Sequence, residues 1–443
     1  MATQKGNYLS RKRLSSLFDG STVLGNIMLL PFLAIMAAPL LEFIRRYPNI
    51  NDYPEGYFPF VVCFLYLAGI AGLAAFFYCL KENNRTLSLR HNAPMVFFVI
   101  TMVWMLLSTA VNGITPEVLY GDVYRRESLY TFVAYFLFLY YGATFIRNEK
   151  QKSILLGIYL ISSTILALRE FAAYMTLPAD LIEKLATVTY MGIVTSVFEQ
   201  FNHYGYYLTV AVLISSVIVR SDIKPLRYLA AVSFLANSAV LVLNNTFGAF
   251  LGCLIGLVFS IIVCSVCSRK LDRTAIGMLA AFLVIALLTN LKCKTLFQNF
   301  TELFSDVGKI ASGAEDARRA GTNRWGIVSA TVRYISERPL LGFGVEGIGK
   351  RLLSEVHIDR PHCEYLQYAA FFGIPAAVSY VLGILHVYLN GLRHRFSLSL
   401  CQKAALIAAF GYLASAAFGN TMYYTAPYLF LLLGIGYSAN SNP

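Results

Sequence analysis

Long apolar stretches alternate with short polar segments along almost the whole chain, and this pattern predicts a helical membrane protein. An α-helix needs about 20 apolar residues to cross a bilayer. Such stretches recur twelve times, at residues 22–44, 57–80, 95–112, 128–146, 153–174, 204–219, 228–244, 247–267, 274–291, 364–389, 404–419 and 421–438. The predicted fold is therefore all-α, a polytopic integral membrane protein with about 12 transmembrane helices in one membrane domain, residues 1–443.

One long polar segment, residues 292–362, interrupts this alternation and predicts a large loop outside the bilayer. Within it, residues 323–337 have the apolar periodicity of an amphipathic helix. Four apolar residues are expected on one face of that helix: Trp325, Val328, Val332 and Ile335. Because tryptophan prefers the membrane interface, we expect the helix to lie along the outer membrane surface.

The composition excludes a soluble globule, because 57% of the residues are hydrophobic and only 14% are charged, against roughly half and about a quarter in soluble domains. Basic residues in short loops indicate the orientation, since cytoplasmic loops are enriched in Lys and Arg. The side that carries both termini holds nineteen such residues. The opposite side holds only Arg45, Arg46, Arg125, Arg126, Arg169 and Lys184. Both termini are therefore predicted to be cytoplasmic, with the 292–362 loop outside.

The long loop is itself basic, with eleven Lys and Arg residues against eight Asp and Glu. This excess suits an anionic ligand. It suits equally a solvated face beside anionic lipid headgroups. Two of the eight cysteines, Cys293 and Cys363, lie at the two ends of the loop and could form a disulfide or remain free thiols.

His362 stands where the long loop re-enters the membrane, between Arg360 and Glu364. A histidine there can accept a hydroxyl proton near neutral pH, and the adjacent carboxylate can orient it or raise its basicity. The alternative is a structural histidine that caps the following helix. His203 and His357 are the other histidines expected on the outer side.

Several arginines are candidates for an anionic ligand, because guanidinium groups hold phosphate groups in a bidentate geometry without a metal. The candidates in the loop are Arg318, Arg319, Arg324 and Arg360. Arg169 lies near the outer end of a predicted span, where an ionisable residue is costly and suggests function. Its structural alternative is a local ion pair with Glu170 or Glu42.

The segment from Pro339 to Gly349 contains a proline and four glycines. Its G-x-G-x-x-G pattern follows no predicted strand, so it is no dinucleotide-binding fingerprint. We expect these glycines to supply tight turns and backbone donors close to a ligand.

Four segments, in this order, resemble the O-antigen ligase and O-antigen polymerase superfamily. They are Phe201-Asn202-His203-Tyr204-Gly205-Tyr206-Tyr207-Leu208, Arg324-Trp325, the Pro339-x-x-Gly342-x-Gly344 turn, and His362-Cys363-Glu364-Tyr365-Leu366 with Gly373-Ile374-Pro375 downstream. The resemblance is strongest over about residues 198–376. Elsewhere it rests on hydropathy alone.

The resemblance implies a membrane glycosyltransferase of the C type that acts without metal or cofactor. Its donor would be a glycan on undecaprenyl diphosphate at the outer face of the cytoplasmic (inner) membrane. The acceptor hydroxyl would belong to lipid A core in a ligase, or to a second lipid-linked glycan in a Wzy-type polymerase. Membrane lipids are expected partners, and nucleic acid is not.

The resemblance also implies roles for individual residues. His362 matches the catalytic histidine, and Arg324 matches the loop arginine that holds the donor diphosphate. Arg318, Arg319, Arg360 and Arg169 are further donor-binding candidates, and Glu364, Tyr365, Asn202 and His203 are supporting residues.

This chain departs from the family pattern at two positions. Cys363 stands where the family has asparagine, and Phe247 where it often has a second diphosphate-binding arginine. A transporter or flippase, the remaining alternative, would carry charges at mid-depth in several spans, whereas the spans here are apolar.

Overall fold

The computed structural model describes residues 23–46, 59–81, 93–122, 126–146, 148–176, 189–190, 193–194, 196–198, 200–312, 321, 324–420 and 422–438. Helices account for nearly all of the regular structure in these ranges. Two short strands, β1 (Thr189–Tyr190) and β2 (Ile193–Val194), pair antiparallel. The prediction of an all-α polytopic membrane protein is confirmed.

Every predicted span corresponds to at least one helix. The helices concerned are α2 (Val23–Arg46), α3 (Pro59–Lys81), α4 (Ala93–Asn112), α6 (Leu129–Thr144), α7 (Glu149–Thr176), α9 (Phe201–Ile218), α10 (Lys224–Leu243), α11 (Phe247–Ser268), α12 (Arg273–Cys293), α16 (Glu364–Phe372), α17 (Ile374–Arg393), α18 (Leu400–Ala416) and α19 (Ala426–Tyr437). In the described part of the chain, seven helices are long and apolar enough to cross a membrane, and further apolar helices are shorter. The total of twelve spans stays a prediction.

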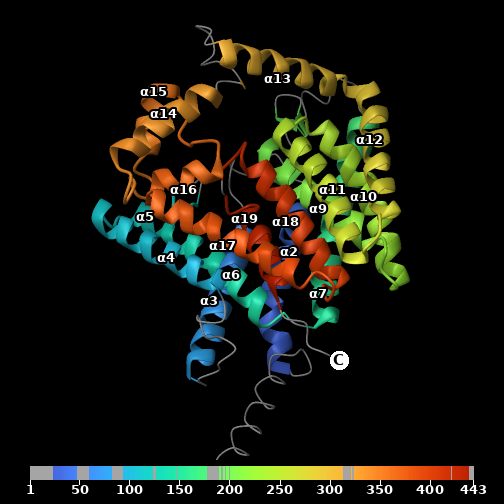
Figure 1. The fold of residues 1–443 in the computed structure, drawn as a ribbon, viewed down its shortest axis with the longest axis horizontal. Coiled ribbons are helices and arrows are strands. Elements are labelled where there is room, and N and C mark those ends of the chain that lie inside the picture. Colours follow the sequence, from blue (N-terminus) through green and yellow to red (C-terminus); the bar gives the residue numbers. More distant parts are fainter. Residues whose placement is uncertain are drawn as a thin grey trace, which may run out of the picture.

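Helices α9, α18 and α19 form the centre of the bundle, and every residue of α9 from His203 to Ile218 is buried. Helix α18 packs against α11, α9 and α19, while α19 packs against α6 (Figure 1). The α11–α18 contact is close at Gly252, where an added Cβ would lie 2.7 Å from the carbonyl oxygen of Gly411. Small residues of this kind let membrane helices approach each other.

The predicted span 364–389 is not one helix, because it breaks at Gly373 between α16 and α17. Gly373 has φ +92°, and a Cβ there would lie 2.1 Å from the carbonyl oxygen of Leu340. Pro375 then stands in the first turn of α17. Hydropathy alone could not reveal the break, since both halves are apolar, although the Gly-Ile-Pro sequence is a local signal for it.

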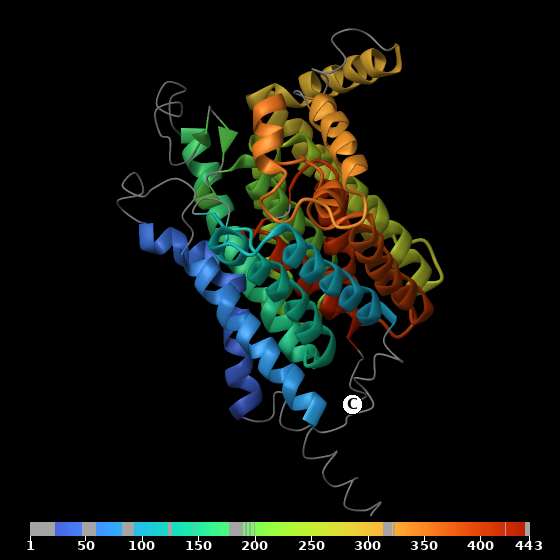
Figure 2. The same cartoon turned by 90° about the vertical axis from the view of Figure 1, so that its left-hand side faces the viewer.

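The long loop contains α13 (Thr295–Ser312), α14 (Arg324–Glu337) and α15 (Gly349–Val356). Helix α13 extends from the end of α12 across one end of the bundle, towards α14 and α15 (Figures 1 and 2). The predicted helix at 323–337 is confirmed as α14. Asn323 lies outside the described residues.

The predicted apolar face of α14 is not the face that packs on the rest of the protein. The residues it buries are Ile327, Ala330, Thr331 and Ile335. Of the four residues predicted on one apolar face, Ile335 is buried, Val328 is half-buried, and Trp325 and Val332 are exposed. That this face lies along the membrane surface stays a prediction. The helix packs on α16 and α15, and two of its buried residues, Ala330 and Thr331, contribute little to an apolar pattern.

Candidate functional site

Four segments meet near one end of the central helices. They are the start of α9, the start of α14, the start of α16 and the connection between α18 and α19. Tyr206 on α9 lies among them, because its phenol interacts electrostatically with Arg324, Glu364 and Cys363. An added Cβ at Gly419 would lie 1.6 Å from its hydroxyl oxygen. Residues far apart in sequence thus form one polar cluster against a buried aromatic core.

His362 is half-buried just before α16 and has a left-handed backbone, with φ +52°. Histidine adopts this conformation more readily than most residues other than glycine. Its backbone N–H donates to Oδ1 of Asn420 at 2.8 Å. The imidazole therefore projects from a backbone whose conformation is held by another segment.

Arg324 is the first residue of α14, and its backbone N–H donates to the carbonyl of Gly321. Burial lowers the pKa of its guanidinium, and interaction with Tyr206 opposes that shift. In the part of the chain that the structure describes, no carboxylate lies within ion-pair distance of Arg324. A partly desolvated cation without an acidic neighbour is suited to bind an anion.

The supporting residues of α16 are anchored to neighbouring helices. The carboxylate of Glu364 is buried and accepts a hydrogen bond from the Tyr380 hydroxyl at 2.6 Å. The Tyr365 hydroxyl donates to the carbonyl of Leu413 at 2.8 Å. These contacts fix α16 against α17 and α18, so both residues place the helix that follows His362.

The start of α9 presents Asn202 and His203. His203 is buried, with its ring centroid 5.6 Å from that of Tyr424 and 6.1 Å from that of Tyr206. Oδ1 of Asn202 is buried and accepts no hydrogen bond from the described residues. The structure therefore places both predicted supporting residues beside the same aromatic core.

Arg360 is fully buried in an ion cluster rather than open to a ligand. Its guanidinium donates to Glu127 at 2.9 Å and to Glu346 at 2.8 Å, and lies 3.6 Å from the carboxylate of Asp359. Gln367 donates to the second oxygen of Glu127 at 2.7 Å. These partners already neutralise Arg360, which favours a structural role.

We expect this cluster to make stability depend on pH through Glu346. Burial raises the pKa of Glu346 to about 7, although Arg360 opposes the shift. Between its ordinary pKa of 4.5 and pH 7 the folded state retains a proton that the unfolded state has released, so stability should fall as the pH rises over this range and level off above about 7. The apparent melting temperature of the purified protein should drop between pH 5 and pH 8.

Glu346→Gln should flatten this decline, because the amide does not titrate. Glu355→Gln is the matched control, since Glu355 pairs with the exposed Arg333 on the loop surface and its removal should leave the slope unchanged. An unaltered slope in Glu346→Gln would show that other groups set the pH dependence.

The other predicted arginines differ in their surroundings. Arg169 donates to both carboxylate oxygens of Glu170 at 2.8 Å, which is the local ion pair considered as its structural alternative. Arg318 and Arg319 lie outside the described residues. Arg324 is thus the predicted donor-binding residue that lies in the same polar cluster as the segment following His362, without an acidic partner among the described groups.

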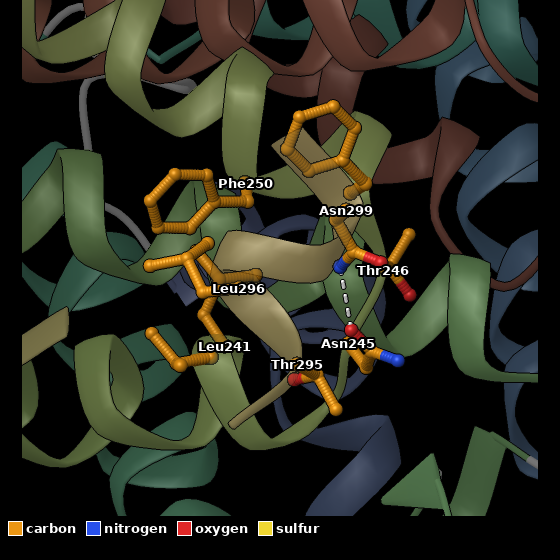
Figure 3. Close-up of a pocket in the computed structure, with 9 residues that line it drawn as sticks. Leu241, Asn245, Thr246, Phe250, Thr295, Leu296 and Asn299 are labelled. Carbon is orange, nitrogen blue, oxygen red and sulfur yellow. Dashed lines mark hydrogen bonds between the residues drawn. The ribbon is translucent and has the colours of Figure 1, made fainter. Parts of the chain in front are cut away.

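Phe247 occupies an apolar contact rather than a polar one. Its ring packs edge-on against Phe300 of α13, with centroids 5.0 Å apart. A small pocket adjoins it, lined by residues of α10, α11 and α13. Two of its lining residues are joined by a hydrogen bond, from Asn299 to Asn245 at 2.7 Å (Figure 3). The position therefore attaches α13 to the bundle.

The glycine-rich turn is confirmed as a turn, but its donors bind protein. Gly342 and Gly344 have φ of +60° and +78°. The N–H groups of Phe343 and Gly344 donate to the carbonyls of Ala370 and Phe371, near the end of α16. The expectation that these donors serve a ligand is wrong, because the break at Gly373 leaves carbonyls that need partners.

Cys293 and Cys363 are free thiols in the structure, so the possible disulfide is absent. Within the described ranges, no three His, Cys, Asp or Glu side chains gather in a group that could hold a metal ion.

Two residues of the site were not singled out from the sequence. Tyr206 lies inside the resembling Phe201–Leu208 segment, where its several tyrosines are equivalent in sequence. Asn420 lies beyond the resembling region, and no local pattern connects it with His362. Only the folded arrangement identifies it.

Part of the chain matches the model of a known family. Residues 231–381 match the family model described as O-antigen ligase, and this segment contains Arg324, His362 and the α16–α17 break. No curated protein matches the chain. The prediction of the O-antigen ligase and polymerase superfamily is confirmed, and the match supports a function of that general type.

Proposed function

We propose that this chain, which carries the O-antigen ligase domain, transfers a glycan from undecaprenyl diphosphate to a hydroxyl of lipid A core. The proposal is supported chiefly by the position of Arg324, which lies in the same polar cluster as the segment that starts at His362. Arg324 is a half-buried cation, and no described carboxylate lies within ion-pair distance of it. Both residues lie within the segment that matches the family.

In the proposed reaction His362 accepts the proton of the acceptor hydroxyl as its oxygen attacks the anomeric carbon of the glycan. The bond between that carbon and the phosphate oxygen breaks, and undecaprenyl diphosphate leaves with the bonding electrons. The proton on His362 then passes to solvent or to the leaving diphosphate. Atoms and charge balance between the lipid-linked donor and the hydroxyl acceptor, and no oxidant or reductant is needed.

Arg324 supplies the positive charge for the leaving group. Negative charge on the diphosphate grows as the bond breaks, and a guanidinium already in place stabilises it without reorganisation. Arg318 and Arg319 remain candidates for the same ligand. The carboxylate partners of Arg360 and Arg169 favour structural roles for those two residues. Arg324 is therefore our first candidate for binding the diphosphate of the glycan donor.

The proposed location is the cytoplasmic membrane, with both termini cytoplasmic and the site at the outer face. The basic residues of the short loops support this orientation. Asn202, His203, Glu364 and Tyr365 would support the site by holding the starts of α9 and α16.

We expect transfer by the purified protein to survive chelation, because arginine rather than a metal would neutralise the diphosphate. Reconstituted protein would receive lipid-linked oligosaccharide and purified lipid A core, with and without EDTA. Equal rates are expected. Activity lost in EDTA and restored by magnesium or manganese would contradict the arginine-only mechanism.

The same assay separates the two members of the superfamily by the mass of the product. A ligase yields lipid A core that carries the glycan. Repeat units accumulating on the lipid diphosphate instead would identify a Wzy-type polymerase.

A further inference from the structure

The connection between α18 and α19 reaches into the site and binds the backbone of His362. Asn420 in this connection is buried, with 6% of its surface exposed, and its Oδ1 accepts the N–H of His362 at 2.8 Å. It lies 58 residues from His362 in sequence and outside the family-matched segment.

His362 needs such a partner because its backbone is left-handed, which is unfavourable for a residue with a side chain. It also precedes α16, where backbone N–H groups lack partners within the helix. Asn420 satisfies this donor and favours the strained conformation over an extended one. The direction in which the imidazole leaves the chain therefore depends on the contact.

Asn420 is itself held in place by close packing. The neighbouring Gly419 has no room for a Cβ, which would lie 1.6 Å from the hydroxyl oxygen of Tyr206. Backbone hydrogen bonds from Phe418 to Ser415 and from Gly419 to Ala416 close the preceding turn. The residues from 417 to 420 also directly follow the buried helix α18, whose packing restricts them.

We propose that Asn420 is a positioning residue, which fixes the backbone of His362 so that the imidazole faces the acceptor hydroxyl. This inference rests on the proposed role of His362 as the general base. Asn420 touches neither donor nor acceptor in this account. Its effect on the reaction passes entirely through His362.

The expected result of Asn420→Ala is a fall in kcat of about 10- to 100-fold, because a small misplacement of a catalytic group costs rates of that order. The KM for the lipid-linked donor should stay within about twofold, since Arg324 is unchanged. Asn420→Asp keeps an oxygen acceptor and should recover most of the lost activity.

A double-mutant cycle distinguishes positioning from general damage to the fold. Adding Asn420→Ala to a His362→Ala background should have no further effect on single-turnover rates. Asn237→Ala is the matched control, because Asn237 is also a buried asparagine, on α10, and binds Ser233. It should leave kcat unchanged.

Three results would overturn the inference while His362→Ala remains inactive: full activity in Asn420→Ala, an Asn420→Asp variant that binds donor yet is as slow as the alanine variant, or an Asn420→Ala effect that persists without His362. If Asn420→Ala does not fold, the inference is tested by Asn420→Asp alone, which should retain most of the wild-type activity. A fully active His362→Ala would instead overturn the proposed role of His362 itself.

Discussion

His362→Ala should lower turnover by about 10²- to 10⁴-fold, the contribution typical of a positioned general base. Donor affinity should remain close to that of the wild type, because proton transfer develops in the transition state and not in the bound ground state. Single-turnover rates and equilibrium donor binding, measured on the same purified variant, separate these two quantities.

His357→Ala is the matched control. His357 also has a left-handed backbone, with φ +56°, and lies in the same loop at the end of α15, but it is exposed. Its loss should leave turnover unchanged. Wild-type turnover in His362→Ala would exclude His362 as the base and leave the base unidentified.

Arg324→Ala should weaken binding of the glycan donor and reduce kcat/KM by about 10²- to 10³-fold. A loss of that size is typical when a preorganised hydrogen-bond donor that stabilises developing charge is removed. Binding changes here, unlike in His362→Ala, because the guanidinium already meets the diphosphate in the ground state. Arg324→Lys should rescue only in part, since a point charge does not reproduce the two parallel donors of arginine.

Arg333→Ala provides the comparison for this substitution. Arg333 lies on the same helix, yet it is exposed and paired with Glu355, so its removal should not change donor affinity. Donor binding that is unchanged in Arg324→Ala would contradict the assignment of the diphosphate to this residue.

Hydropathy predicted the helices because a membrane-spanning helix depends on local composition, and each predicted apolar stretch is helical in the structure. It did not predict where a helix breaks. The break at Gly373 depends on the carbonyl of Leu340, from a turn more than thirty residues earlier. The residues that α14 buries were not predicted either, because two of them, Ala330 and Thr331, do not stand out by hydrophobicity.

From the sequence, site residues could be predicted only where the chemistry of the side chain itself suggests a role. His362 and Arg324 were named from the sequence, and the structure brings their segments together around Tyr206. Arg360 was named for the same reason, but its surroundings depend on Glu127, which is 233 residues away. Whether an arginine is open to a ligand or neutralised inside the protein is decided by partners that no local pattern reveals.

The most direct test of the account is to measure both products of one reaction. Wild-type protein in liposomes would receive donor labelled in the glycan and in the lipid diphosphate, together with acceptor. The account predicts that glycosylated acceptor and free undecaprenyl diphosphate appear in equal amounts, and that His362→Ala slows both equally. Glycan transfer without release of the lipid diphosphate, or equal rates in His362→Ala, would contradict it.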